Sequence, residues 1–281
     1  MTTASTVIPA SVAEDPYAAA PRTSALRFLY ALNPLAKMAA ILPAIVLLVF
    51  VRDLATPLAF LALAYVVLLV GIALSIRAAA VLTLAIPGAI LVLGVGFSLW
   101  TDAALVADTP PVLQIGAWTL HSDALQIGFA TGLRLGAILA LSLIPGLSTT
   151  GPDLVRACVQ QLRVPYRIGY TALAAFRFVP RFGHELEIIR QAHRVRGAHR
   201  GRGPIASVRR WASYIVPLLA GAIRHAERVA LAMDSRAFGA YPERTERHLV
   251  PFRARDVVFI AAFWVASAAL FVAFFPWAPP I

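Results

Sequence analysis

Five stretches of apolar residues, each close to the length that crosses a membrane, constrain this chain more than any other feature. They lie at roughly 35–51, 57–76, 78–100, 125–147 and 255–276. About 20 consecutive apolar residues are needed to cross about 30 Å of hydrocarbon. The composition agrees, because 59% of the residues are hydrophobic and 14% are charged, against about 45–50% and about 25% in soluble domains. We therefore expect an all-α integral membrane protein with about five transmembrane helices.

The positive charge is concentrated in one segment. Residues 151–256 hold 19 of the 25 Lys and Arg residues and 8 of the 14 Asp and Glu residues, which accounts for the whole net charge of +11. Positive charge beside membrane spans marks the cytoplasmic side. A basic segment can also bind nucleic acid. No interleaving of aromatic and basic residues and no nucleic-acid motif accompanies it here, so we predict no nucleic-acid partner.

The charges between the apolar stretches predict the orientation. The loop 101–124 holds three aspartates and neither Lys nor Arg, which fits the extracytoplasmic face. Arg77 stands in the short turn between the second and third stretches, and Arg22, Arg27 and Lys37 flank the first. Lys and Arg are enriched in cytoplasmic loops. We expect a multi-pass protein of the cell (inner or plasma) membrane with its N-terminus and its basic segment in the cytoplasm.

The chain is expected to be organised in four parts. Residues 1–25 are polar and mixed, lack the apolar run of a signal peptide, and are predicted to be a disordered tail. Residues 26–150 hold the first four transmembrane helices. Residues 151–240 form the basic region of two or three long amphipathic helices, expected on the cytoplasmic side. Residues 241–281 are a linker and the last transmembrane helix.

The fourth apolar stretch contains a row of glycines and one charge. Gly128, Gly132 and Gly136 are spaced by four, so they share one helix face and let a neighbouring backbone approach closely. That neighbour is either another helix of this chain or a separate membrane subunit. Arg134 lies near the middle of the stretch, where a charge is costly and usually faces a partner or a cavity. It is a candidate functional residue or a member of a structural ion pair.

Three helices are predicted in the basic region. A short one covers 154–162, and two long ones cover about 165–197 and 205–238, each with apolar residues at a period of 3.6 and charges elsewhere. At 1.5 Å per residue each long helix measures about 45 Å. Arg181 and Glu185 have the spacing of an i,i+4 ion pair. Such helices are expected to lie along or just inside the membrane surface.

The two long helices end alike. One ends in Arg194-Val195-Arg196-Gly197 and the other in Asp234-Ser235-Arg236-Ala237. A terminal arginine offsets the partial negative charge of the last carbonyl groups. The small residue after it leaves room for the backbone of a partner, and a guanidinium can bind a carboxylate in bidentate geometry. A single such ending indicates a charged helix cap, whereas two in one basic segment favour docking to another protein.

Several of these motifs together resemble one family, from about Leu32 to the end of the chain. The family is the transmembrane T component of energy-coupling factor (ECF) transporters, which are ABC-type importers of vitamins and metal ions. The matching stretches are Leu32-Asn33-Pro34-Leu35-Ala36-Lys37, Arg134, Ser148-Thr149-Thr150-Gly151-Pro152-Asp153-Leu154, Arg177-Phe178-Val179-Pro180, and Gln191-Ala192-His193-Arg194-Val195-Arg196-Gly197. The second arginine motif departs from the family, which usually has Gly where Ala237 stands.

The resemblance implies a role for each motif. Arg196 and Arg236, the centres of two x-Arg-x motifs, would insert into grooves of two ATPase subunits, with Arg194, Asp234, Arg177 and Pro180 in supporting positions. The long helices would carry ATP-driven motion to a membrane-embedded substrate-binding S component. The resemblance thus implies a coupling and scaffold subunit for uptake of a vitamin or of a metal ion such as cobalt. The ending 237–241 weakly suggests the branch of the family for thiamine precursors.

Catalytic chemistry is not predicted for this chain. No Gly-Lys pair exists, so a Walker A phosphate loop is excluded. The six histidines form no compact ligand set, no Gly-x-Ser-x-Gly elbow occurs, and Cys158 is the single cysteine. We predict no catalytic residue, no cofactor and no metal site. Two alternatives to the coupling subunit remain, a membrane-embedded enzyme acting on lipid-linked phosphates and a self-contained channel or secondary transporter. The enzyme would need clustered acids or a nucleophile, and the transporter an inverted repeat.

Overall fold

A computed structural model describes the residues 27–101, 110–115, 118–197, 203–242, 244–246 and 248–275. The chain divides into two compact units. The first unit consists of Met1–Thr150 and Pro251–Ile281, and the second is Gly151–Val250. The predicted tail over residues 1–25 lies outside the described residues.

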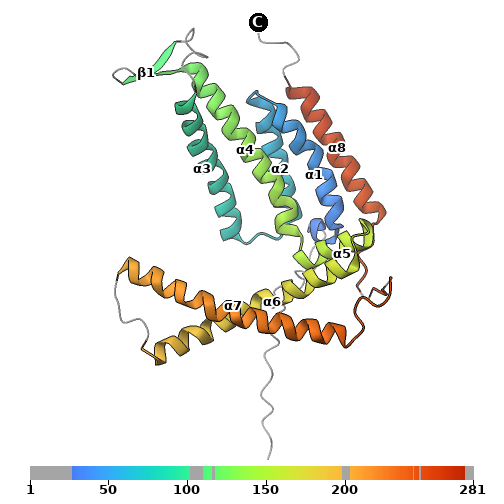
Figure 1. Cartoon of the computed structure of the whole chain (residues 1–281). Helices are drawn as coiled ribbons and strands as arrows, with labels where there is room; N and C mark the ends of the chain where they lie inside the picture. Colours follow the sequence, from blue (N-terminus) through green and yellow to red (C-terminus); the bar gives the residue numbers. More distant parts are fainter. Residues whose placement is uncertain are drawn as a thin grey trace, which may run out of the picture. The chain divides into compact units, whose positions relative to one another are not determined.

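The first unit is a helical bundle (Figure 1). Its elements in chain order are η1 (Phe28–Ala31), α1 (Pro34–Phe50), α2 (Ala55–Gly71), α3 (Ile76–Trp100), β1 (Pro111–Ile115), β2 (Trp118–His121), α4 (Ser122–Ser148) and α8 (Ala254–Phe274). Helix α4 packs against α1, α2 and α3, and α8 packs against α1 and α2. The five predicted stretches correspond to α1, α2, α3, α4 and α8, which confirms the all-α membrane fold. The antiparallel hairpin β1–β2, in the loop before α4, was not predicted.

Polar side chains begin several of these helices. The Oδ1 atom of Asn33 accepts a hydrogen bond from the Leu35 N–H at 3.0 Å, and Pro34 occupies the first turn of α1. Ser75 Oγ accepts from the Ala78 N–H at 3.1 Å at the start of α3. These bonds satisfy N–H groups that have no partner within the helix. Local residue types therefore determine where these helices begin, independently of contacts with distant residues.

The bundle has the dimensions and surface of a membrane protein. Helices α3, α4 and α8 are long and apolar enough to cross a membrane, while α1 and α2 are apolar helices of 17 residues, at the lower limit of that range. In the most apolar 18-residue stretch of α3 only 17% is buried inside the protein, and in the corresponding stretch of α8 only 11%. Such long apolar faces left open on the outside match a lipid environment.

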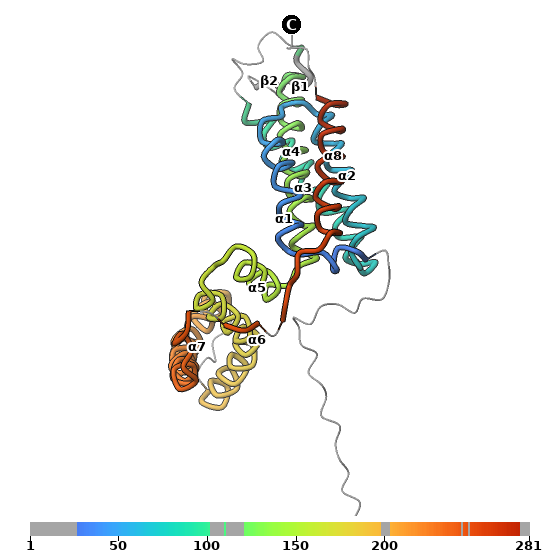
Figure 2. Tube along the Cα trace, turned by 90° about the vertical axis from the view of Figure 1, so that its right-hand side faces the viewer, coloured from blue at the N-terminus to red at the C-terminus, as the bar shows by residue number. Residues whose placement is uncertain are grey.

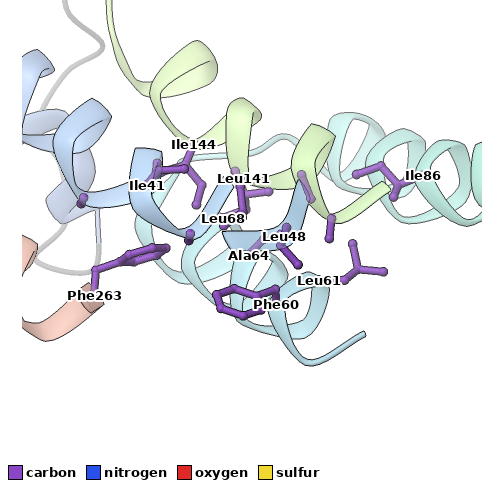
Figure 3. Packing of buried hydrophobic residues seen from close by; sticks show 14 of the residues in the cluster. Ile41, Leu48, Phe60, Leu61, Ala64, Leu68, Ile86, Leu141, Ile144 and Phe263 are labelled. Atoms are coloured by element: carbon purple, nitrogen blue, oxygen red, sulfur yellow. The ribbon is translucent and has the colours of Figure 1, made fainter. Parts of the chain in front are cut away.

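The core of the bundle lies where α1, α2 and α4 meet (Figure 3). Its largest apolar members, all fully buried, include Phe60, Leu68, Leu48, Leu141, Ile144 and Ile41. Small residues fill the closest approaches, because Ala40, Ala64, Ala137 and Ala140 are completely buried. In a bilayer, lipid tails are as apolar as leucine, so helices associate through close packing rather than through removal from water. The alanines make this close packing possible.

The second unit contains two long crossing helices (Figures 1 and 2). The unit consists of α5 (Gly151–Gln161), α6 (Tyr166–Val195) and α7 (Pro204–Asp234). Helix α6 packs against both α5 and α7. With 30 and 31 residues, α6 and α7 are each about 45 Å long. All three helices lie within a few residues of the predicted bounds.

Residues 241–250, predicted as part of the linker to the last transmembrane helix, belong to the second unit. The Gln160 side chain donates to His248 O and accepts from the Val250 N–H, both at 2.8 Å. Gln161 Nε2 donates to Val250 O, also at 2.8 Å. These bonds hold the segment against α5 up to the border with the first unit.

Candidate functional site

The end of α6 presents Arg196 directly after the last helical residue, Val195. The Arg196 N–H donates to Ala192 O at 3.1 Å, and the N–H of Gly197 donates to Arg194 O at 3.1 Å. Gly197 has a φ of +64°, in the left-handed region. This is a common way to end a helix, and glycine adopts it without strain. The backbone turns sharply after Arg196 and leaves its side chain exposed.

The end of α7 repeats this geometry around Arg236. Ala237 has a φ of +53° and its N–H donates to Asp234 O at 2.9 Å. The Phe238 N–H donates to Met233 O at 3.0 Å, which completes the pattern of a Schellman motif. Arg196 and Arg236 therefore each precede a left-handed residue. The residue types predicted the match of the two endings, but they did not indicate that Ala237 takes a backbone conformation that suits glycine.

Both arginine motifs form open surfaces. The residues of the two endings, Arg194, Val195, Arg196, Gly197, Asp234, Ser235, Arg236 and Ala237, are all exposed. The guanidinium groups of Arg196 and Arg236 have no hydrogen-bond or ion-pair partner among the residues that the structure describes. Each guanidinium thus stands at the negative end of a long helix, available to a carboxylate from another molecule.

The two arginines lie at opposite ends of the crossing pair. Phe238, just after Arg236, meets the Tyr166 ring at the start of α6, with ring centroids 5.8 Å apart. The Arg167 guanidinium donates to Gly239 O beside it. Arg196 stands at the other end of α6. The length of α6, about 45 Å, therefore separates the two arginines.

Aromatic and small residues hold α6 and α7 together. Phe178 of α6 stacks on His225 of α7 with ring centroids 4.3 Å apart. Farther along, a Cβ added to Gly221 would lie 3.3 Å from Glu185 Oε1, so this carboxylate lies against the α7 backbone. The predicted pair of Arg181 with Glu185 is wrong, because the ion pairs among the described residues are Arg156–Asp153 and Arg190–Glu187.

Arg177 and Pro180 both lie in the middle of α6 near this contact, and both are exposed. Pro180 has no N–H and therefore removes one main-chain hydrogen bond from α6. Pro217 does the same in α7. The two long helices thus each carry an interruption near their middle, where local bending is easiest.

A second face of α7 is apolar and uncovered. Its exposed residues recur every three or four positions, which places them on one side of the helix. They are Ile205, Val208, Ala212, Ile215, Leu219, Ile223, Ala226 and Ala230. We call this face the α7 stripe. Leu218, Ala222 and His225 are on a different side of α7 and line the contact with α6, together with a small cavity of about 60 Å³.

The intramembrane arginine of α4 binds carbonyl groups. Arg134 Nη1 donates to Val51 O at 3.2 Å and to Val49 O at 3.4 Å, both at the end of α1. Its positive charge therefore stands at the negative end of the α1 dipole. No carboxylate forms an ion pair with Arg134 in the described part of the chain.

The glycine row of α4 faces α3 of the same chain. An added Cβ would lie 2.4 Å from Gly94 O at Gly128, 2.8 Å from Ile90 O at Gly132, and 2.5 Å from Ile90 Cγ1 at Gly136. At Gly128 and Gly132 the nearby atom is a main-chain oxygen, and real Cβ atoms essentially never come within 3.0 Å of another atom. The row thus lets α3 and α4 pack backbone to backbone.

Metal-binding groups are not clustered in the described residues. No group of three or more His, Cys, Asp or Glu side chains there could hold a metal ion. The features that stand out are instead the two exposed arginine endings and the uncovered α7 stripe, all of which suit contact with other proteins.

Comparisons with known proteins identify the family. The profile of the family described as "Cobalt transport protein" (CbiQ) matches residues 26–247. The energy-coupling factor transporter transmembrane protein EcfT of Staphylococcus aureus is 28% identical over 162 residues, which cover 55% of this chain and 60% of the relative. EcfT of Bacillus subtilis is 25% identical over 170 residues, covering 58% of this chain and 64% of the relative.

A third relative is named for ATP binding. The putative ABC transporter ATP-binding protein BL0043 of Bifidobacterium longum is 28% identical over 169 residues, which cover 57% of this chain but 22% of the relative. The chain thus spans less than two thirds of the length of these relatives. The family profile nevertheless covers most of the chain, from the start of the bundle to the end of the crossing helices. The chain belongs to the CbiQ family of cobalt transport proteins, the T-component family that its motifs resemble.

Proposed function

We propose that this chain is the transmembrane coupling subunit of an ECF-type ABC importer. It binds two ATPase subunits through Arg196 and Arg236, and it transmits their ATP-driven motion to a membrane-embedded S component that binds the substrate. The observation that carries the proposal is the repetition of one exposed arginine ending at both ends of the crossing helices. Membership of the CbiQ family supports it.

Two separate partners fit the spacing of the arginines. The endings are about the length of α6 apart, about 45 Å, which is more than the diameter of a small domain. Each ending offers an exposed guanidinium next to a sharp turn with little side-chain bulk. A partner with a groove that has a carboxylate at its bottom would bind the guanidinium through two parallel hydrogen bonds. Arg194 and Asp234 flank the motifs, and Arg177 and Pro180 lie in the middle of α6, the helix between the two endings, in supporting positions.

ATP hydrolysis is assigned to separate chains. The sequence holds no Gly-Lys pair and hence no Walker A loop. The name of the Bifidobacterium relative pairs a similar segment with an ATP-binding protein. This supports a working association between such a membrane component and ATPases. The chain itself then acts as a mechanical link rather than as an enzyme.

The α7 stripe supports contact with a membrane partner. Its residues Ile205, Val208 and Ile215 are 84%, 70% and 55% exposed, and they stand in a segment that carries the whole net charge. A helix with one apolar and one basic face suits the membrane boundary. We infer that an S component, together with the bilayer, covers the stripe. The basic charge supports a cytoplasmic location for this region and for the N-terminus.

The substrate is proposed as a class. ECF-type importers take up vitamins and metal ions, and the family description names cobalt. The S component, not this chain, would select the substrate. No residue of this chain is therefore assigned to substrate binding.

A charge reversal at both endings tests the proposal. The variant with Arg196→Glu and Arg236→Glu should no longer copurify with the ATPase subunits of its transporter, and ATP-driven uptake should stop. Arg209→Glu is the matched control, because Arg209 is an exposed arginine of α7 outside the motifs. Copurification and uptake that survive the double reversal would contradict the docking role. Uptake by the purified chain alone in liposomes would instead identify a self-contained transporter.

A further inference from the structure

Among the described residues of the helical bundle, two ionisable side chains are buried almost completely. Lys37, the only lysine of the chain, is 1% exposed, and Asp256 is 0% exposed. A buried charge is tolerated only where hydrogen bonds satisfy it, because removing it from water is costly. Their partners therefore show what these residues hold in place.

Lys37 joins the start of α1 to the end of α4. Its Nζ donates to Ser148 O at 2.9 Å, to Ser148 Oγ at 3.0 Å and to Leu29 O at 3.2 Å. Three acceptors match the three N–H groups of an ammonium group. Ser148 is the last residue of α4, so the positive charge also stands at the negative end of that helix. Ser148 Oγ in turn donates to Ile144 O at 2.6 Å.

Asp256 joins the same part of the chain to the start of α8. Its Oδ1 accepts from the Asn33 N–H and its Oδ2 from the Arg253 N–H, both at 2.7 Å. The carboxylate lies in the first turn of α8, at the positive end of that helix. The Arg255 guanidinium adds a bond to Ala31 O. Residues 29–37 thus receive bonds from both α4 and α8.

The hydrogen bonds of Lys37 and those of Asp256 lie beside the two places where the chain passes between the units. After Ser148, two residues lead to Gly151, the first residue of the second unit. On the way back, Pro251 is the first residue of the bundle unit, and Arg253 follows closely. Both passages are therefore fixed to residues 29–37, which we call the anchor segment.

We propose that the anchor segment is the point where movement of the crossing helices enters the bundle, with Lys37 and Asp256 as its positioning residues. This proposal rests on the proposed coupling function. A force on either passage acts first on the last turn of α4 or the first turn of α8. Helix ends fray easily because their main-chain groups lack partners. The bonds of Lys37 and Asp256 prevent fraying, so that both passages move the bundle as one body.

Uncoupling is the expected result when the anchor is broken. Lys37→Met keeps the length of the side chain but removes all three hydrogen bonds. Asp256→Asn keeps one side-chain oxygen as an acceptor. Its amide N–H₂ group faces the other main-chain N–H and cannot accept a hydrogen bond from it. In the complete complex with ATPases and S component, reconstituted in liposomes, both variants should still copurify with the ATPases and hydrolyse ATP. The amount of substrate imported per ATP should fall about tenfold or more.

Asp53→Asn is the matched control. Asp53 Oδ2 likewise accepts from a main-chain N–H, that of Thr56 in the first turn of α2, at 2.7 Å. It lies between α1 and α2, a helix length of about 25 Å along α1 from Lys37, and next to neither passage. This variant should keep the wild-type ratio of import to hydrolysis. An unchanged ratio in assembled Lys37→Met and Asp256→Asn complexes would overturn the proposal.

Hydrogen exchange of the wild-type complex provides a test that needs no variant. The N–H groups of Asn33 and Arg253 donate to a buried carboxylate, so peptides covering 29–37 and 251–257 should stay protected while the complex turns over ATP. Rapid exchange during turnover would show that the anchor opens, and would refute the proposal even if the variants do not fold. A wild-type complex without ATP-driven uptake would instead refute the coupling function itself.

Discussion

Gly197 and Ala237 occupy the same position in two helix endings, each directly after the exposed arginine and each in the left-handed region, with φ of +64° and +53°. Their N–H groups make equivalent bonds, to Arg194 O and to Asp234 O. Glycine takes this conformation freely, whereas an L-residue with a Cβ is strained by about 1–2 kcal/mol. The second ending therefore carries backbone strain at Ala237 that the first ending avoids at Gly197.

Ala237→Gly should stabilise the end of α7. Relief of the strain gives about 1–2 kcal/mol, and the greater freedom of glycine in the unfolded chain takes back about 0.4–1 kcal/mol. The net gain should be about 0.5–1 kcal/mol. Slower exchange of the Phe238 N–H, which donates to Met233 O at 3.0 Å, would show it locally. Gly197→Ala is the mirror experiment, and it should speed exchange at the end of α6; equal exchange in both variants and the wild type would show that the endings are not strained.

The sequence was sufficient for the helices but not for contacts between distant residues. Apolar runs and the prolines and glycines that flank them predicted α1 to α8 closely, since those signals are local. The bond of Lys37 to Ser148 joins residues 111 positions apart, and no periodicity indicates it. The i,i+4 spacing of Arg181 and Glu185 allowed a pair, but Glu185 lies against Gly221 of α7 instead. The hairpin β1–β2 was not predicted, since its strands of five and four residues are too short for a clear alternating pattern.

Gly128→Ala should separate α3 from α4. The new methyl group would lie 2.4 Å from Gly94 O and 2.6 Å from Ser98 N, and neither backbone atom can move without shifting α3. Forcing a methyl group into a packed interior costs about 1–3 kcal/mol. We expect a lower unfolding temperature of the purified protein in detergent. Gly146→Ala is the control on the same helix, because nothing lies within 4 Å of its added Cβ; a loss of stability as large as that of Gly128→Ala would contradict the packing argument.

Arg134→Leu should destabilise the end of α1. The variant leaves Val51 O and Val49 O without their donor, at 3.2 and 3.4 Å in the wild type. Hydrogen bonds to charged groups contribute about 1.5–3 kcal/mol each, and the longer of these two contributes less. The unfolding temperature in detergent should therefore fall. Thr131→Val is the control, because Thr131 Oγ1 donates only within α4, to Ile127 O at 2.8 Å, and its loss should have little effect.

Arg196→Lys should weaken ATPase binding without abolishing it. Lysine keeps the charge at the helix end but cannot form two parallel hydrogen bonds to a carboxylate. The loss of one charge-assisted hydrogen bond, about 1.5–3 kcal/mol, corresponds to a decrease in affinity of about tenfold or more. Titration of the ATPase onto the reconstituted chain would measure it. An affinity equal to that of the wild type would show that charge alone, and not bidentate geometry, governs docking at this ending.

The stability of the second unit should decline in strongly alkaline solution because of Tyr170. Burial raises the pKa of Tyr170 above its ordinary value of 10.0, and so do the hydrogen bond to Glu246 and the charge of that carboxylate, while Arg244 and Arg156 act in the opposite direction. Above pH 10 the unfolded chain loses this proton first, so the folded state binds more protons and its stability falls as the pH rises. Below pH 10 the phenol is protonated in both states, and its hydrogen bond to Glu246 Oε2, at 2.5 Å, is retained.

The unfolding temperature above pH 10 should therefore decline more steeply in the wild type than in Tyr170→Phe. Tyr241→Phe is the control for the loss of one phenol, because the Tyr241 side chain is 74% exposed. Identical pH profiles for the wild type and Tyr170→Phe would show that this bond does not hold the segment 241–250 against α6.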